Sequence, residues 1–357
     1  LNHVISGEVT SEALIGLGSG YTSTLATGAG DQNVSLFFDA SGDVIFNGVS
    51  TVITPDVKAL NGIVHVVNAV IDIPNIVDHA IANPGLTSLV GALTDGGNTT
   101  FTDLLSNEEE TFTVFAPGND AFSAFTNPNS NDLNAILSNH VVVGAAAFSS
   151  DLTNSYVNTA AEFAADENLS LYINTDDGVT LNGTSSVVTA DIVASNGVIH
   201  TVNAVIDLPT VVTFAVADPN FSTLVQALTE LTPSTDFVSV LSAQDGAGSD
   251  PFTVFAPTNA AFDALASIPA EADLIPILQH HVVAGANIRS GDLSDGATAT
   301  TLEGDMITIN LPGTGDNIAD ITDGAGNTGI GIDAVDVQAI NGVIHVVDTV
   351  LIPNTTN

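Results

Sequence analysis

The chain has 357 residues, with 41 Asp and Glu against 2 Lys and Arg, and its formal net charge is −39 at pH 7. This length exceeds what one hydrophobic core usually serves, so several domains are expected. Such an acidic surface repels phosphate groups, which excludes nucleic acid as a partner, and no apolar run is long enough for membrane insertion. The absence of cysteine excludes disulfides and thiolate chemistry.

The charge balance also indicates a habitat. Lys58 and Arg289 are the two cationic side chains apart from histidine, so most carboxylates lack a cation partner and repel one another. Salt at seawater strength shortens the Debye length below about 8 Å and removes most of this repulsion. We therefore expect a salt-adapted protein that is secreted, extracellular or held at a cell surface.

One motif recurs three times along the chain: NGIVHVVNAVIDIP at 61–74, NGVIHTVNAVIDLP at 196–209 and NGVIHVVDTVLIP at 341–353. The spacing far exceeds the about 20 to 50 residues of solenoid repeats, so each motif marks a whole domain. We call the three segments the first, second and third copies. The predicted bounds are 1–74, 75–209 and 210–353, with a tail at 354–357.

The first copy is predicted to be only the C-terminal half of a domain, because His3 aligns with His140 and His281 in the middle of the other copies. The missing half is expected to come from upstream sequence or from a neighbouring chain. Upstream sequence is the favoured source, because the far end closes after Pro353 without a spare half. Completion by a neighbouring chain, which would make a polymer, is the alternative.

Each complete copy begins with a pattern that predicts helices. Apolar residues recur at helical spacing over 75–82 and 86–93, with a Pro-Gly break between them. TFTVFAPGNDAF at 111–122 and PFTVFAPTNAAF at 251–262 each predict a buried strand that ends at proline and leads into a helix. Asn119 and Thr258 are expected to cap these helices by accepting hydrogen bonds from free N–H groups.

The second half of each copy predicts strands. In the second copy, short β-rich segments at 169–174, 179–182 and 186–193 are separated by Asp, Asn and Gly turns, which favours an antiparallel meander. The Asn-Gly pair predicts a tight turn into a hairpin strand at 198–202, which ends before proline. Because helices and strands are segregated, we expect an α+β fold.

TVFAPTNAAF at 253–262, HHVVAG at 280–285 and the Asn-Gly motif at 341–353 resemble the two boxes and the central histidine of the fasciclin-like domain family. The resemblance covers 111–209 and 253–353, and its second half covers 3–74. It implies tandem fasciclin-like domains, each a β-sheet wedge with a layer of short helices, in a protein of the extracellular surface or matrix that is not an enzyme.

The family's tyrosine before the central histidine is missing here. Asn2, Asn139 and His280 occupy this position, so the integrin-linked activity of animal relatives is not carried over. What the resemblance implies is the fold and a general role in adhesion or assembly.

Histidine and asparagine recur at equivalent positions of the copies. A side chain that completes the fold must recur in every copy, whereas a catalytic residue need not, so we predict hydrogen-bonded, structural roles. No histidine spacing is typical of a zinc site, and no catalytic residues or cofactor are predicted. The predicted fold-signature residues are His3, His140, His281, Asn61, His65, Asn196, His200, Asn341 and His345.

Asp316, Asp320 and Asp323 are weak calcium candidates. They lie in a turn with oxygen ligands and glycine, but their spacing is not that of an EF-hand loop. Aspartate is common in turns because it bonds the local backbone, so we predict no specific metal site.

The sequence therefore predicts an extracellular adhesive or structural protein that self-associates on a cell surface, in a matrix or in a filament. Its expected partners are further copies of itself or other surface and matrix proteins. Glycans are a further option, since six N-x-S/T sequons occur, as many as chance gives. The alternative is a carrier of a small apolar ligand such as a carotenoid.

Overall fold

The computed structural model describes residues 1–244 and 251–354. The chain divides into two compact units. Unit 1 comprises Leu1–Thr153, Thr175–Thr180 and Ser185–Ile206, and unit 2 comprises Asn154–Asn174, Leu181–Thr184 and Asp207–Asn357. Unit 2 thus contains one hairpin of the second copy together with the third copy. Of the tail predicted at 354–357, residues 355–357 lie outside the described residues.

The first copy forms one helix, one short 3-10 helix and an antiparallel sheet with the strand order β1-β2-β3-β4-β5. Its elements are α1 (Ser11–Leu17), β1 (Ser19–Thr27), η1 (Ala29–Asp31), β2 (Asn33–Asp39), β3 (Ile45–Phe46), β4 (Ser50–Ala59) and β5 (Gly62–Val67).

The second copy adds the helical half that the first copy lacks. Its sheet has the order β7-β6-β12-β11-β10-β9-β8. The helices are α2 (Ile76–Ala82), η2 (Pro84–Leu86), α3 (Thr87–Leu93), η3 (Asp95–Gly97), α4 (Thr100–Leu105), α5 (Asn119–Ala124) and α6 (Leu133–Ser138). The strands are β6 (Phe112–Pro117), β7 (Val141–Val143), β8 (Ser155–Ala164), β9 (Glu167–Asn174), β10 (Thr180–Leu181), β11 (Ser185–Val193) and β12 (Gly197–Val202).

The third copy repeats this plan with the order β14-β13-β19-β18-β17-β16-β15. The helices are α7 (Val211–Ala217), η4 (Pro219–Phe221), α8 (Ser222–Thr229), α9 (Phe237–Leu241), α10 (Asn259–Asp263), α11 (Glu271–His280) and η5 (Ser290–Asp292). The strands are β13 (Phe252–Pro257), β14 (Val282–Ala284), β15 (Thr298–Thr300), β16 (Met306–Asn310), β17 (Ala319–Thr322), β18 (Ile330–Ala339) and β19 (Gly342–Val347).

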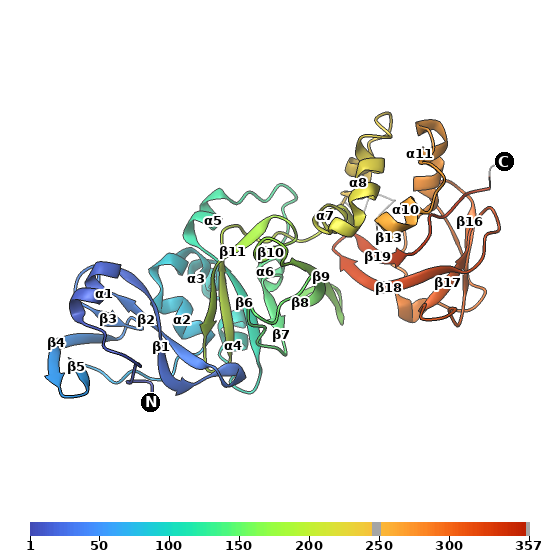
Figure 1. Ribbon diagram of the computed structural model, residues 1–357. Helices are drawn as coiled ribbons and strands as arrows, with labels where there is room; N and C mark the ends of the chain where they lie inside the picture. Colours follow the sequence, from blue (N-terminus) through green and yellow to red (C-terminus); the bar gives the residue numbers. More distant parts are fainter. Residues whose placement is uncertain (245–250, 355–357) are drawn as a thin grey trace. The chain divides into compact units, whose positions relative to one another are not determined.

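Helices and strands are segregated in the chain and in space, as predicted for an α+β fold. In the third copy, α7, α8, α10 and α11 gather on one side of the strands (Figure 1). The sheet of the third copy is apolar on both faces. One face packs under the helices through aromatic side chains, and the other face closes a β-branched core. The first group includes Phe214, Phe221, Phe237, Phe252 and Phe262, and the second includes Phe255, Ile307, Ile309, Ile321 and Ile332.

A parallel pair of strands joins the two halves of each complete copy. β6 pairs with β12 from Phe112↔Gly197 to Pro117↔Val202, and β13 pairs with β19 in the same register. Every residue of β6 and β13 is buried, as predicted for the Phe-Thr-Val-Phe-Ala-Pro segments. The helical half and the strand half are thus held together by backbone hydrogen bonds in the centre of the sheet.

The Asn-Gly pair has a different role from the predicted one. Ala339 pairs with Gly342, so the turn consists of Ile340 and Asn341, and the glycine is already the first residue of the strand. A Cβ atom on Gly342 would lie 2.1 Å from the Phe252 carbonyl oxygen. Glycine is needed here mainly because the neighbouring parallel strand approaches the backbone too closely for any side chain.

The first copy leaves this edge of its sheet open. Within the described residues, β5 pairs only with β4, and a Cβ atom on Gly62 would meet nothing within 4 Å. Val64 is 53% exposed, whereas its counterpart Ile344 in the third copy is 2% exposed. The strand that is central in the other copies is therefore an unpaired edge in the first copy.

Replacement of Gly342 and Gly62 by alanine should distinguish a glycine that faces a neighbouring parallel strand from a glycine at the edge of a sheet. The glycines have similar φ angles, 153° and 159°, so the backbone strain is shared and only the surroundings differ. Gly342→Ala should destabilise the third copy by about 1–3 kcal/mol more than Gly62→Ala destabilises the first copy, because only Gly342 faces a neighbouring carbonyl group. Hydrogen exchange of β19 and β5 peptides measures this. Equal losses of protection would contradict the assignment.

Candidate functional site

The asparagine of the Asn-Gly motif connects three segments of a complete copy. Asn341 is 1% exposed, and its Oδ1 accepts a hydrogen bond from Val211 N–H at 3.0 Å. Its Nδ2 donates to the carbonyl oxygens of Leu241 at 2.8 Å and Ala243 at 2.9 Å. One amide thus fixes the start of α7, the end of α9 and the turn before β19. In the second copy Asn196 makes the same contacts with Ile76, Leu105 and Asn107.

The first recurrent histidine binds the segment that closes each copy. His281 Nδ1–H donates to Ile277 O at 2.8 Å, and its Nε2 accepts from Leu351 N–H at 2.9 Å. Both nitrogens are used, so the ring is neutral. Burial lowers the pKa of His281 to about 4 and that of His140 to about 4. The equivalent contacts are His140 with Ile136 and Ile206, and His3 with Ile71.

The second recurrent histidine lies under the sheet. His345 Nε2–H donates to Ile288 O at 2.8 Å, and the ring lies 5.6 Å from that of Phe255. Burial lowers the pKa of His345 and that of His200. The equivalent bonds join His200 to Ala147 and His65 to Val9. The geometry of all six histidines is that of ties between loops and strands.

A recurrent Ser-Asp pair was missed by the sequence reasoning. Asp336 has φ of 61° at a bulge of β18, and its carboxylate accepts from Ser290 N–H at 2.8 Å and from Ser290 Oγ–H at 2.5 Å. The hydroxyl therefore donates to a carboxylate and not to a histidine, which is the wrong order for a nucleophilic serine with a histidine base. The pairs Ser11–Asp56 and Ser149–Asp191 are equivalent. The available signal was an aspartate at the same place before each Asn-Gly motif.

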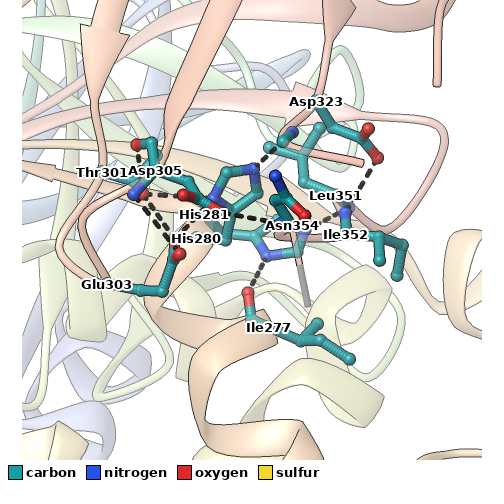
Figure 2. Close-up of polar contacts among 11 residues, drawn as sticks. Ile277, His280, His281, Thr301, Glu303, Asp305, Asp323, Leu351, Ile352 and Asn354 are labelled. Carbon is teal, nitrogen blue, oxygen red and sulfur yellow. Dashed lines mark hydrogen bonds and ion pairs between the residues drawn. The ribbon is translucent and has the colours of Figure 1, made fainter. Parts of the chain in front are cut away.

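The third copy has an additional buried histidine beside His281. His280 replaces the asparagine of the other copies. Its Nδ1–H donates to Glu303 Oε2 at 2.8 Å, and its Nε2 accepts from Gly324 N–H at 3.0 Å. Figure 2 shows the contacts that converge here from α11, from the turn 301–305 and from the segment 351–354. The pair of histidines thus fixes a hairpin turn and the last residues of the copy.

The two predicted helix caps differ in the structure. Thr258 is the N-cap of α10, and its Oγ1 accepts from Ala261 N–H at 3.3 Å. The prediction for Asn119 was wrong, because Gly118 occupies the capping position and Asn119 is the first helical residue. Its side chain accepts instead from Ser88 N–H at 2.9 Å and joins α5 to α3.

Two of the three weak calcium candidates, Asp320 and Asp323, bind protein groups in the structure, and Asp316 is exposed. Asp320 accepts from Asn317 Nδ2–H and Thr314 N–H, which lowers the pKa of Asp320. Asp323 accepts from Asn327 and from Ile352 N–H. Among the residues described, no three acidic or histidine side chains form a group that could hold a metal ion.

Each helical layer encloses a small apolar cavity. The cavity in the second copy has a volume of about 60 Å³ and is lined by Leu86, Phe101 and His140 among others, and that in the third copy has about 40 Å³. Pockets for drug-sized ligands have about 300–1,000 Å³. These cavities give the predicted carrier function no support, and that function stays a prediction.

The sequence profile of the Fasciclin domain matches residues 1–74, 84–209 and 219–353. A fasciclin-like arabinogalactan protein of Arthroderma benhamiae is 32% identical over 165 residues, which are 45% of this chain and 37% of that protein. Human periostin is 28% identical over 309 residues, which are 78% of this chain and 32% of that protein. The match thus spans about a third of the length of these two relatives.

Among solved structures, a FAS1 domain pair from the insect cell adhesion molecule fasciclin I is similar, with a TM-score of 0.47 and 20% identity. The likeness covers 75% of this chain and 97% of that structure. Within the described part of the chain, no helix is both long and apolar enough to span a bilayer.

Replacement of Asn341 by alanine should destabilise the third copy by about 2–4 kcal/mol, since three hydrogen bonds of buried groups are lost. The same change at Asn61, which is exposed, serves as the matched control and should cost under about 0.5 kcal/mol. Urea unfolding with hydrogen exchange as the local readout checks both. Comparable costs at the two positions would show that Asn341 is not a structural tie.

The buried histidines should make the protein less stable in acid. In the folded state His281 has a pKa of about 4, below the value of about 6.5 of an unfolded chain. The unfolded state therefore binds the proton first, and stability that is present above about pH 6.5 falls by up to about 1.4 kcal/mol per pH unit as pH drops toward 4. His281→Gln should flatten this slope relative to the unmodified protein in urea titrations at pH 7, 6 and 5. An unchanged slope would contradict the buried, neutral state.

Proposed function

This chain belongs to the Fasciclin domain family, and on that premise we propose that it acts outside the cell as a self-associating adhesive or structural protein. The proposed domains are 75–209 and 210–353, preceded by the half-domain 1–74. The similarity to a fasciclin-like arabinogalactan protein and to periostin supports this proposal. Asn196, Asn341, His140 and His281 support it too, because their side chains bind the protein's own backbone.

One observation carries the proposal of self-association, namely that within the described residues β5 pairs with β4 alone, at the place where the complete copies have a Phe-Thr-Val-Phe-Ala-Pro strand. An unpaired strand presents a row of N–H and C=O groups that can pair with another chain, and proteins normally block such edges with lysine, proline or a covering loop. Here the edge has apolar, exposed side chains. The exposed apolar residues of β4, β5 and their flanks are Ile53, Val57, Leu60, Val64, Val66, Val70 and Ile73.

The charge of the chain determines when this edge is used. With a net charge of −39, two copies repel each other at low ionic strength, and apolar contact or strand pairing must overcome that repulsion. Salt screens the repulsion and also strengthens apolar association. Self-association should therefore increase with salt, which suits an extracellular and saline setting.

Light scattering across 0.05 to 2 M NaCl, roughly the range from weak to nearly complete screening, should show a mass that rises with salt. Val64→Lys should abolish the rise, because a charged side chain on an edge strand opposes pairing. Val188→Lys is the matched control, since Val188 is 69% exposed on β11, which has a neighbour on each side. A monomer at every salt concentration would refute self-association, and equal effects of both variants would refute the edge as its site.

A further inference from the structure

Two hairpins connect one copy to the next. We call β1–β2 the first arm and β8–β9 the second arm. In the first arm, Ser35 Oγ accepts a hydrogen bond from the backbone N–H of Val193 at 2.9 Å, across 158 positions of sequence. In the second arm, Ser170 Oγ accepts from Gln338 N–H at 3.0 Å, across 168 positions. Val193 and Gln338 are the equivalent residues of β11 and β18, so both arms dock in the same way.

A tyrosine makes the second contact of each arm. Tyr156 O–H donates to the Asp218 carboxylate at 3.0 Å, and its ring lies 5.5 Å from that of Phe214. Burial, reinforced by this carboxylate, raises the pKa of Tyr156 and keeps it protonated as a donor. Asp218 is also the N-cap of η4, so the tyrosine binds a rigid helix start of the following copy.

The first arm makes its contact at the same positions, but the hydrogen bond between the tyrosine and the capping residue runs in the opposite direction. Asn83 caps η2 and donates from Nδ2 to Tyr21 Oη at 3.2 Å, and the Tyr21 ring lies 5.7 Å from that of His79. An asparagine can donate where an aspartate accepts, and a tyrosine hydroxyl can do either. The chain has 3 tyrosines, Tyr21, Tyr156 and Tyr172, and all of them lie in these two arms.

The corresponding hairpin of the third copy, β15–β16, is shorter at its tip. A threonine marks the base of the tip in each copy by donating across the hairpin to a backbone carbonyl. Thr159 Oγ1–H donates to Leu169 O at 3.2 Å, whereas Thr301 Oγ1–H donates to Asp305 O at 2.9 Å. The tip thus comprises residues 160–168 in the second arm and only residues 302–304 in the hairpin of the third copy. The first arm has the long form, with Thr24 bonded to Val34.

The third hairpin also lacks both docking side chains. Cross-strand register places Thr298 at the tyrosine position, since Thr298 pairs with Thr308 as Tyr156 pairs with Tyr172. It places Met306 at the serine position, and Met306 is 59% exposed where Ser170 is 2% exposed.

The shortened tip is fixed to its own copy. Glu303, in the middle of the turn, accepts from His280 Nδ1–H at 2.8 Å and from Thr301 Oγ1–H at 2.9 Å. In the first copy the residue equivalent to His280 is Asn2, whose Oδ1 accepts from Thr24 Oγ1–H at 3.1 Å. His280 and Glu303 therefore belong together with the short turn.

We propose that the arm is the device by which one copy recognises the following copy, and that the third copy has lost it. The partner that fits an arm is a fasciclin domain with an Asx-capped 3-10 helix and with a backbone N–H of its long strand, just after the bulge, available to the serine. The tyrosine binds the residue that caps the helix, and the serine binds the backbone N–H group. Docking of this kind ends at β15–β16, whatever sequence accompanies the chain.

The test extends the full chain by a second copy of residues 210–353 placed directly after Pro353, which supplies an intact docking surface. The chain has no cysteine, so introduced cysteines can carry spin labels at single positions. Val216→Cys in both the third and the added copy reports on the new junction by electron–electron distance measurement. Ile81→Cys with Val216→Cys reports on the existing junction, because both positions are exposed and equivalent.

We expect a narrow distance distribution at the existing junction and one at least about twofold broader at the new junction. Tyr156→Phe combined with Ser170→Ala removes two hydroxyl groups and should broaden the existing junction. Replacing residues 302–304 by residues 160–168, together with Thr298→Tyr and Met306→Ser, should narrow the new one. An equally narrow distribution at the new junction without the graft would overturn the proposal. So would an existing junction that stays narrow in the double variant, a result that does not depend on folding of the graft.

Discussion

The parallel pairing of a Phe-Thr-Val-Phe-Ala-Pro strand with an Asn-Gly strand is the constraint on which each complete copy depends. It joins β6 to β12 and β13 to β19, and it brings the two backbones so close that only glycine fits at the first position. The neighbouring asparagine then fixes the first helix of the copy and the loop before the buried strand. Where the partner strand is missing, as beside β5, the same residues lie exposed and the sheet ends in an open edge.

A chain with 41 carboxylates and 2 cationic side chains cannot hold its interior with ion pairs. The buried polar ties are accordingly neutral amides, imidazoles and hydroxyls that bind backbone groups, and the recurrent aspartates are satisfied by serine. Burial keeps His140 and His281 neutral at physiological pH, so these two side chains add no charge to the interior. The contacts between copies also avoid ion pairs. Tyrosine and serine hydroxyls take the place of the salt bridges that other proteins use at interfaces.

The three copies share one fold but not one set of contacts. The first has an arm and an open edge, the second has an arm and a complete core, and the third has a complete core and a short hairpin fixed by His280 and Glu303. Such an arrangement has a direction, because the residues that dock lie on the hairpin, and the residues that receive them lie at the 3-10 helix and on the long strand of the following copy.

The sequence by itself determined the repetition, the segregation of helices and strands and the burial of the Phe-Thr-Val-Phe-Ala-Pro strands. These features are periodic or local, so they can be read along one chain. The tertiary structure decided that glycine serves a close approach more than a turn, that Gly118 and not Asn119 is the N-cap of α5, and that Ser170 and Tyr156 contact the third copy. Asn341 lies 130 positions from Val211, and Ser170 lies 168 from Gln338. No local pattern encodes which backbone group a side chain will meet over such separations, because that depends on the packing of elements that the pattern itself does not place.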